Sequence, residues 1–216
     1  MKVCTDACIL GAWTAQRLGK AGHILDIGTG TGLLSLMLAQ ESNARFDAIE
    51  LDSDSFEQAK INIQGSNWSD RIRIFLADVR SFQLPESYDF IITNPPFYEH
   101  DLISPVKSIN SARHGFSLTL DELIRVIKKN LRSEGAFSIL LPARRFGYFQ
   151  KLAFEYGYHL KERVLLCPSP QHDPFRTIGL FDHVPGEPIL HEKFIIALKD
   201  GTHTENMKAL MEKYYL

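Results

Sequence analysis

Residues 23–40 decide the fold, and they read His-Ile-Leu-Asp-Ile-Gly-Thr-Gly-Thr-Gly-Leu-Leu-Ser-Leu-Met-Leu-Ala-Gln. The apolar run over 23–27 predicts a buried strand, and the run over 33–40 predicts a buried helix. Glycines at every second position between them let the backbone turn at positive φ and approach a ligand closely. A strand, a glycine loop and a helix in this order form the first unit of a parallel α/β sheet.

Strands and helices alternate along the rest of the chain. Further strands are expected near 45–50, 71–77, 88–93 and 136–141, and helices near 5–18, 52–65, 119–135 and 144–156. They are followed by two β-rich stretches near 158–166 and 175–183, an apolar stretch at 189–198 and a short helix at 203–213. This alternation predicts a single Rossmann-like, doubly wound α/β sheet over residues 1–216, mostly parallel with an antiparallel C-terminal strand pair.

The composition is that of an ordinary globular chain of 216 residues, with 44% hydrophobic and 23% charged residues. The net charge of −2 provides no global basic field, so nucleic-acid binding would require a local basic patch. The sequence has no leader and no apolar run of ~20 residues, so a reduced, cytoplasmic protein without a membrane span is expected. The oligomeric state is not defined by the sequence.

The three cysteines are Cys4, Cys8 and Cys167. Cys4 and Cys8 have the spacing of one helix face, but no further Cys or His stands near them at ligand spacing. No metal site is therefore expected, and Cys4 and Cys8 are both expected to be small buried residues.

Ligands of parallel sheets bind at the C-terminal ends of the strands, so the residues after each strand are the candidates for a site. Asp26 stands two residues before Gly28 at the end of the first strand. A dinucleotide fingerprint would place glycine at position 33, where this chain has Leu33. Asp26 would repel a pyrophosphate but can pair with a cationic amino group, so the loop favours a zwitterionic amino-acid ligand over a dinucleotide.

Acidic residues also end the second and third strands. Glu50 stands about 20 positions beyond the glycine loop, where ribose hydroxyls are bound in nucleotide-binding sheets. Asp78 can accept a hydrogen bond from an adenine amino group while Val79 packs against the ring. Taken singly, each acid is equally well explained as a solvated strand end, a helix cap or a turn residue.

The fourth strand is followed by Asn94-Pro95-Pro96-Phe97, which can form an acceptor site for an exocyclic amino group. Asn94 supplies a side-chain carbonyl, and the Asn-Pro peptide supplies a main-chain carbonyl for which proline has no competing N–H. Phe97 provides a flat surface on which a base can stack. A proline-rich turn is the alternative, but four signals at four consecutive strand ends favour a nucleoside site.

As a set, these motifs resemble the class I S-adenosylmethionine-dependent methyltransferases that methylate amino groups. The flanking sequences resemble more closely the bacterial tRNA1(Val) (adenine(37)-N6)-methyltransferase family, over essentially the whole chain. The stretches that carry the resemblance are Met1-Lys2-Val3-x-Thr5-Asp6, Leu10-Gly11-Ala12-Trp13, Asp26-Ile27-Gly28-x-Gly30-x-Gly32-Leu33-Leu34, Ile49-Glu50, Ala77-Asp78, Asn94-Pro95-Pro96-Phe97, Ala112-Arg113 and Tyr214-Tyr215-Leu216. The chain departs from the family at Cys4, where glycine is usual, and it lacks the N-terminal segment that members usually carry before Met1.

The resemblance implies a class I methyltransferase fold, S-adenosylmethionine as cofactor, no metal, and N6-methylation of adenosine in tRNA, at A37 of tRNA(Val). It implies that the catalytic acceptor site is formed by Asn94, Pro95, Pro96 and Phe97. The residues that it implies for the cofactor are Thr5, Asp6, Asp26, Gly28, Thr29, Gly30, Gly32, Glu50, Leu51, Asp78 and Val79.

Contacts to RNA are expected from residues beyond the fourth and fifth strands, on the ligand side of the sheet. These are Tyr98, Lys107, Arg113, His114, Arg144 and Arg145. A solvated basic rim explains each of these cations equally well.

Two other functions remain open from the sequence. A protein glutamine-N5 methyltransferase would suit the same amine-accepting site, although that group usually has a helical domain before the glycine loop and only residues 1–27 precede it here. A non-catalytic module that binds the cofactor or a nucleoside would be expected to have lost Asn94, Pro95 or Phe97, and all three are present.

Overall fold

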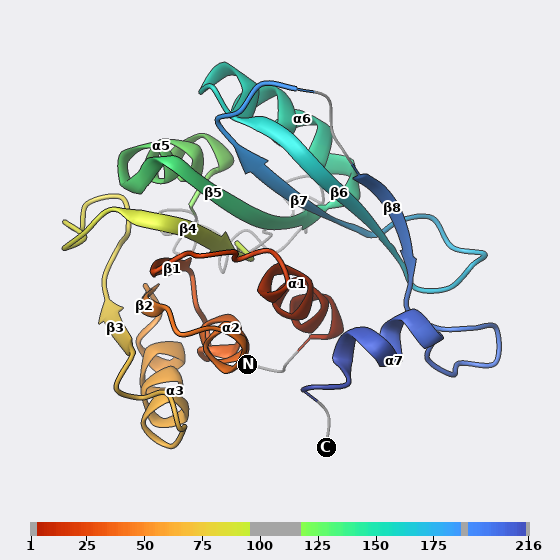
Figure 1. Cartoon of the computed structure of the whole chain (residues 1–216), viewed down its shortest axis with the longest axis horizontal. Coiled ribbons are helices and arrows are strands. Elements are labelled where there is room, and N and C mark those ends of the chain that lie inside the picture. The colour runs from red at the N-terminus through yellow and green to blue at the C-terminus, as the bar shows by residue number, and fades with distance from the viewer. Residues whose placement is uncertain (1–3, 96–117, 187–189, 215–216) are drawn as a thin grey trace, which may run out of the picture.

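The computed structural model describes residues 4–95, 118–186 and 190–214. Figure 1 shows the chain as one twisted sheet with helices on both sides. The strands and helices, in chain order, are α1 (Thr5–Ala15), β1 (His23–Ile27), α2 (Leu33–Glu41), β2 (Arg45–Glu50), α3 (Ser53–Gln64), β3 (Ile72–Leu76), β4 (Tyr88–Thr93), α5 (Leu120–Asn130), β5 (Leu131–Pro142), α6 (Ala143–Glu155), β6 (His159–Cys167), β7 (Arg176–Asp182), β8 (Leu190–Ile195) and α7 (Glu205–Met211).

The sheet has eight strands in the order β3-β2-β1-β4-β5-β7-β6-β8. Strands β1 to β5 pair in parallel, whereas β7 lies between β5 and β6 and is antiparallel to both. The mostly parallel α/β sheet with an antiparallel C-terminal pair is therefore confirmed. The structure adds β8, which extends the sheet by pairing in parallel with β6.

Two apolar clusters lie on opposite faces of the sheet. One includes buried residues of α1, α2, α3 and α7, and the other includes buried residues of α5 and α6. Neighbouring residues of one strand belong to different clusters: Ile24 of β1 to the first and Leu25 to the second, both fully buried. Because both faces of β1 are covered, its apolar residues include the neighbours Ile24 and Leu25, which point to opposite faces, instead of alternating with exposed polar residues.

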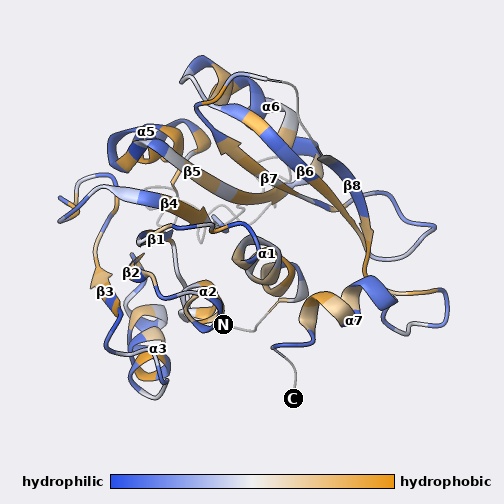
Figure 2. Cartoon of the chain, viewed as in Figure 1, coloured by the Kyte–Doolittle hydropathy of each residue, from blue (hydrophilic) through white to orange (hydrophobic). Residues whose placement is uncertain are grey.

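The helices are amphipathic where only one side meets the sheet. Helix α5 shows hydrophilic and hydrophobic stripes in Figure 2, and its buried side is formed by Leu120, Leu123, Ile124 and Ile127. The expected capping box is confirmed, since the side chain of Thr119 accepts from the backbone of Glu122 and Glu122 accepts from the backbone of Thr119.

The boundary between α5 and β5 differs from the sequence prediction. Helix α5 ends at Asn130 rather than near Gly135, and β5 begins at Leu131 rather than at position 136. Leu131 has helical spacing from Ile127, but it pairs with Tyr88 of β4 and is buried as the first strand residue. The partner strand, and not the local apolar pattern, decides its conformation.

The first helix begins at the predicted position but ends earlier than predicted. Thr5 is its first helical residue and Cys4 its N-cap, and the helix ends at Ala15 rather than near Leu18. Because Cys4 lies ahead of the first turn, it is exposed, and the prediction that it is buried is wrong. Cys8 is buried as expected.

Within the described residues, no helix has the length and apolarity needed to cross a membrane. In the same part of the chain, no three His, Cys, Asp or Glu side chains come together as a set of metal ligands.

Candidate active site

The C-terminal ends of β3, β2, β1 and β4 form one continuous row at an edge of the sheet, because these four strands are adjacent and parallel. Hydrogen bonds join each end to the next. The Ala77 N–H donates to the Glu50 carbonyl at 2.9 Å, and the Gly28 N–H donates to the Ile49 carbonyl at 2.9 Å. The Thr93 hydroxyl donates to the Ile27 carbonyl at 2.9 Å. The four sequence signals therefore lie side by side.

The loop after β1 depends on its glycines. Gly28, Gly30 and Gly32 have φ values of 69°, 60° and 84°, a region that other residues adopt only with strain. Gly32 is the N-cap of α2, and a Cβ on it would lie 3.5 Å from the Cβ of Ala59 in α3. Around a Cβ on Gly28, no atom of the described residues lies within 4 Å, so this side of the loop is open.

Asp26 lies beneath this loop and is fully buried. Its Oδ2 accepts from the Thr29 hydroxyl at 2.6 Å, the Ser35 hydroxyl at 2.8 Å and the Ser35 N–H at 3.2 Å. Its Oδ1 is buried and has no hydrogen-bond partner among the described residues. Burial raises the pKa of Asp26 to about 6. Oδ2 thus fixes the loop to α2, and only Oδ1 remains for the cationic amino group expected from the sequence.

Glu50 connects the loops after β1 and β2. Its Oε2 accepts from the Gly30 N–H at 2.8 Å, and its Oε1 accepts from the N–H groups of Leu51 and Asp52, both at 2.9 Å. A carboxylate has about four acceptor positions, so the hydrogen bonds of the described residues leave one position on Glu50 at which a hydroxyl could donate. Leu51 beside it is 38% exposed and offers an apolar surface.

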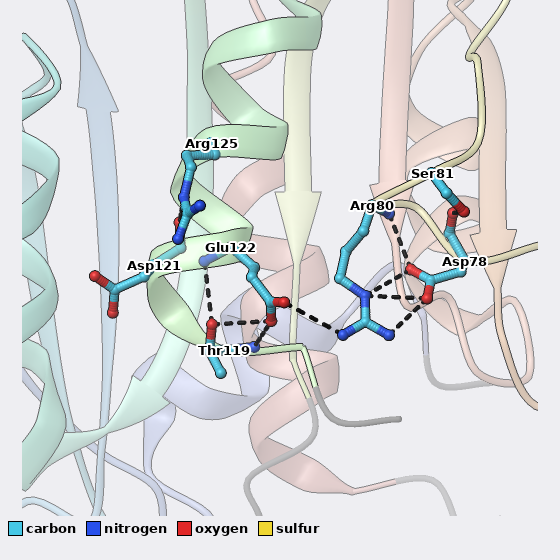
Figure 3. Close-up of polar contacts among 7 residues, drawn as sticks. All are labelled: Asp78, Arg80, Ser81, Thr119, Asp121, Glu122 and Arg125. Carbon is cyan, nitrogen blue, oxygen red and sulfur yellow. Dashed lines mark hydrogen bonds and ion pairs between the residues drawn. The ribbon is translucent and has the colours of Figure 1, made fainter. Parts of the chain in front are cut away.

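Asp78 lies at the end of β3 in a salt bridge with Arg80 that is shown in Figure 3. The Arg80 Nη2 donates to Oδ2 at 2.6 Å, Nε is shared between both oxygens at 2.9 and 3.0 Å, and the backbone N–H donates to Oδ1 at 2.9 Å. These hydrogen bonds from Arg80 hold the pKa of Asp78 below its usual range. Val79 packs against the apolar cluster of α5 and α6.

Asn94 follows the fully buried Thr93 at the end of β4. Its Oδ1 is buried and has no hydrogen-bond partner among the described residues. An unpaired buried carbonyl costs about 1–3 kcal/mol, so such groups call for an explanation. A ligand N–H at this position would satisfy it. Pro95 is also buried.

Several of the expected site residues lie outside the described part of the chain, namely Pro96, Phe97, Tyr98, Lys107, Arg113 and His114. Arg144 and Arg145 are exposed in the first turn of α6, directly after β5 and at the same edge as Asn94. Of the residues expected to contact RNA, the described part of the chain includes this pair, and it lies at the site.

Thr5 and Asp6 form the start of α1. The Asp6 Oδ2 accepts from Nε of Arg176 at 3.1 Å. Arg176 is the first residue of β7 and pairs with Pro142, the last residue of β5. The start of α1 is thereby tied to the edge of the sheet that carries the other candidate residues.

Three residues of the site were not found from the sequence. Ser35 and Arg80 hold the two loops, and Thr93 links β4 to β1. An arginine two residues after a turn aspartate is a usable signal for Arg80. Ser35 and Thr93 lie within apolar runs, and nothing in the pattern separates them from ordinary small core residues.

The family model described as the methyltransferase small domain matches residues 9–160, which is most of the chain. A solved structure of a predicted O-methyltransferase from Agrobacterium tumefaciens has the same fold, with a TM-score of 0.72 over 96% of each chain at 17% identity. The fold and the row of strand-end residues thus define a methyltransferase.

Curated relatives define the family within this class. A protein of Dyadobacter fermentans is 41% identical, with an alignment that covers 100% of this chain and 91% of the relative. A protein of Phocaeicola vulgatus is 38% identical with the same coverage. Both are named tRNA1(Val) (adenine(37)-N6)-methyltransferase, and the chain belongs to this family. The resemblance seen in the sequence is confirmed, and the glutamine-N5 alternative is not favoured.

Proposed function

We propose that the protein transfers a methyl group to the N6 amino group of an adenosine in tRNA, at A37 of tRNA(Val), with S-adenosylmethionine as methyl donor. The observation that carries the proposal is the buried Oδ1 of Asn94, which has no hydrogen-bond partner among the described residues and lies next to the glycine loop in the row of strand ends. Its relatives' names supply the substrate class.

The residues present fit S-adenosylmethionine. The open side of Gly28 and the buried Oδ1 of Asp26 suit its methionine part. Glu50 has one acceptor position for a ribose hydroxyl, with Leu51 beside it. Asp78 and Val79 would hold the adenine. Bound in this order along the row, the cofactor supplies an electrophilic methyl group.

The remaining residues of the proposed cofactor site lie in the loop and in α1. Thr29, Gly30 and Gly32 complete the glycine loop, which leads into α2 through its N-cap Gly32. Thr5 and Asp6 would close the site from α1, where Asp6 is held by Arg176.

Asn94 would orient the target amine. Its Oδ1 accepts one N6 hydrogen, and a main-chain carbonyl of the Asn94-Pro95 segment accepts the other, so the nitrogen lone pair is directed to the methyl group. No strong base is needed beforehand, because the amine loses its proton after it has become cationic. Alignment of this kind contributes several kcal/mol, up to about 7–11. Stacking of the flipped adenine on Phe97, next to Pro96, stays a prediction.

The tRNA would approach from the β5 side of Asn94, since the cofactor residues occupy the β1–β3 side of the row. Arg144 and Arg145 are exposed on that side and would contact phosphates. Contacts by Tyr98, Lys107, Arg113 and His114 stay predictions from the sequence.

The test is methylation of tRNA from cells that lack the activity, with S-adenosylmethionine labelled in its methyl group. Label is expected in a tRNA(Val) species as N6-methyladenosine. Incorporation into protein but not RNA would contradict the proposal.

A paired variant tests the role of Asn94. Asn94→Ala should abolish turnover while the affinity for S-adenosylhomocysteine stays within about twofold, because Asn94 touches the amine and not the cofactor. Asn67→Ala, in an exposed turn after α3, is the matched control and should keep both. Equal loss of cofactor binding in Asn94→Ala would make Asn94 a structural residue.

A further inference from the structure

Arg80 is held between two elements that are far apart in the sequence. One side of its guanidinium forms the salt bridge with Asp78, and Nη1 lies 3.3 Å from Oε1 of Glu122 in the first turn of α5. Figure 3 shows the Arg80 side chain extended from Asp78 to Glu122. The loop after β3 is thereby connected to a helix that packs on one face of the sheet.

Glu122 is itself fixed. Its Oε2 accepts from both the N–H and the hydroxyl of Thr119, each at 2.9 Å. The α5 end of the contact is thus a rigid helix terminus rather than a free side chain. Arg80 is consequently restrained at both ends.

Among the described residues, the hydrogen bonds leave Asp78 with one open acceptor position. Arg80 presents three hydrogens to this carboxylate, from its backbone N–H, Nε and Nη2. A carboxylate accepts about four hydrogen bonds, so one position remains. Because both oxygens are engaged, rotation of the carboxylate would break the bidentate contact.

Stability does not account for this arrangement. The side chains of Arg80, Asp78 and Glu122 are 27%, 29% and 31% exposed. Partly exposed ion pairs contribute little to folding, since water screens the charges and two long side chains must be ordered. A contact with this geometry and little effect on stability points to a role in the site.

We propose that Arg80 is a positioning residue that fixes Asp78 as an acceptor with a single open position, and so makes the cofactor site select a 6-amino purine over a 6-oxo purine. The proposal rests on the proposed function, in which Asp78 faces the adenine. A 6-amino group donates to the open position. A 6-oxo group cannot donate, and a fixed carboxylate cannot rotate to the N1–H that a 6-oxo purine carries instead.

The experiment is calorimetric titration with S-adenosylhomocysteine and with S-inosylhomocysteine, which carries the 6-oxo ring. The wild type should prefer the adenosyl ligand. In Arg80→Ala, affinity for that ligand should fall about tenfold while affinity for the inosyl ligand stays within about twofold, so the preference falls about tenfold. Arg80→Lys should lie between, because an ammonium group lacks the planar bidentate geometry.

Arg125→Ala is the matched control, since Arg125 lies on α5 and contacts only the Asp121 carbonyl of the same helix among the hydrogen bonds of the described residues. It should bind both ligands like the wild type. An unchanged preference in Arg80→Ala, or equal weakening of both ligands, overturns the proposal.

Two further outcomes distinguish misfolding from a change in ligand preference, and failure of the Arg80 proposal from failure of the proposed function. If Arg80→Ala unfolds, Arg80→Lys and Glu122→Gln decide, and an unchanged preference in both overturns the proposal. Glu122→Gln should reduce the preference about twofold to threefold, because it removes the charge that holds Nη1. Failure of the wild type to bind either ligand would contradict the proposed function instead.

Discussion

The loops after β1 and after β3 each place an aspartate at the site, but in opposite environments. Asp26 is fully buried, receives hydrogen bonds from the uncharged Thr29 and Ser35 among the described residues, and has its pKa raised to about 6 by burial. Asp78 is 29% exposed, is paired with Arg80, and has its pKa lowered. The first carboxylate orders its loop from beneath, whereas the second is partly exposed, and in the proposed function it accepts a hydrogen bond from the adenine.

The two loops also differ in what determines their backbone conformation. The first requires three glycines at positive φ, and the second has none in its turn over residues 77–82. Side-chain hydrogen bonds from Arg80 order the second loop instead. The first loop is therefore specified by its glycines, and the second by hydrogen bonds from a side chain within the loop itself.

The largest expected effect is that Asp26→Ala and Asp78→Ala rank in opposite order for loss of stability and for loss of cofactor binding. Asp26→Ala leaves the donors of Thr29 and Ser35 buried and unpaired, so the free energy of unfolding should fall by about 3 kcal/mol. Asp78→Ala should cost about 1 kcal/mol or less, because its salt bridge is partly exposed. Urea denaturation at pH 7 measures both.

Cofactor binding should show the opposite order. Among the folded molecules, Asp78→Ala should weaken S-adenosylhomocysteine binding more than Asp26→Ala does. Similar losses of stability in the two variants would mean that the two aspartates do not have distinct roles.

The pH dependence of stability gives the second test. The pKa of Asp26 is about 6 in the folded chain and about 4 when unfolded. Its contribution to the free energy of unfolding is therefore fully present below pH 4 and is lost as pH rises through 6. The loss amounts to about 3 kcal/mol. Denaturation measures the free energy of unfolding of the wild type and of Asp26→Asn. From pH 4 to pH 7.5, that of the wild type should fall by about this amount relative to that of the variant. Taking a difference removes the titration of the histidines, and a constant difference would contradict the raised pKa.

Strands β1, β2 and β4 were predicted well because they are buried on both faces. The observed bounds of β1, β2 and β4, His23–Ile27, Arg45–Glu50 and Tyr88–Thr93, are those of the apolar runs. The local apolar pattern cannot assign a residue that fits both a helix and the following strand. Leu131 is such a residue, and its pairing with Tyr88 makes it part of β5.

The side-chain contacts of the site were less accessible to prediction. Glu122 lies 42 residues from Arg80, and Arg176 lies 170 residues from Asp6, so no local spacing links either pair. The role of Asp26 beneath the loop follows from Ser35, whose hydroxyl faces inward in a helix that reads as uniformly apolar. Motifs locate the strand ends, and the fold determines which donors meet them.

A third prediction concerns the backbone of the first loop. Gly32→Ala should lower the free energy of unfolding by about 1–2 kcal/mol, because an L-residue at φ 84° is strained. Gly147→Ala is the matched control: Gly147 is exposed within α6 and has no described atom within 4 Å of an added Cβ. It should gain about 0.5–1 kcal/mol. If Gly32→Ala were also neutral or stabilising, the first loop would not depend on its glycines.

The smallest expected effect concerns Glu122, the residue of α5 that contacts Arg80 in the loop after β3. Glu122→Gln retains an oxygen for the Thr119 N–H, and glutamine suits the capping box, so the unfolding free energy should change by less than about 0.5 kcal/mol. Thr119→Ala removes the cap and should cost about 1 kcal/mol. Chemical denaturation of the two variants at pH 7 compares them. If Glu122→Gln cost as much as Thr119→Ala, the Arg80–Glu122 contact would stabilise the fold by itself. The proposed contrast, in which the loop after β1 serves the fold and the loop after β3 serves ligand binding, would then no longer hold.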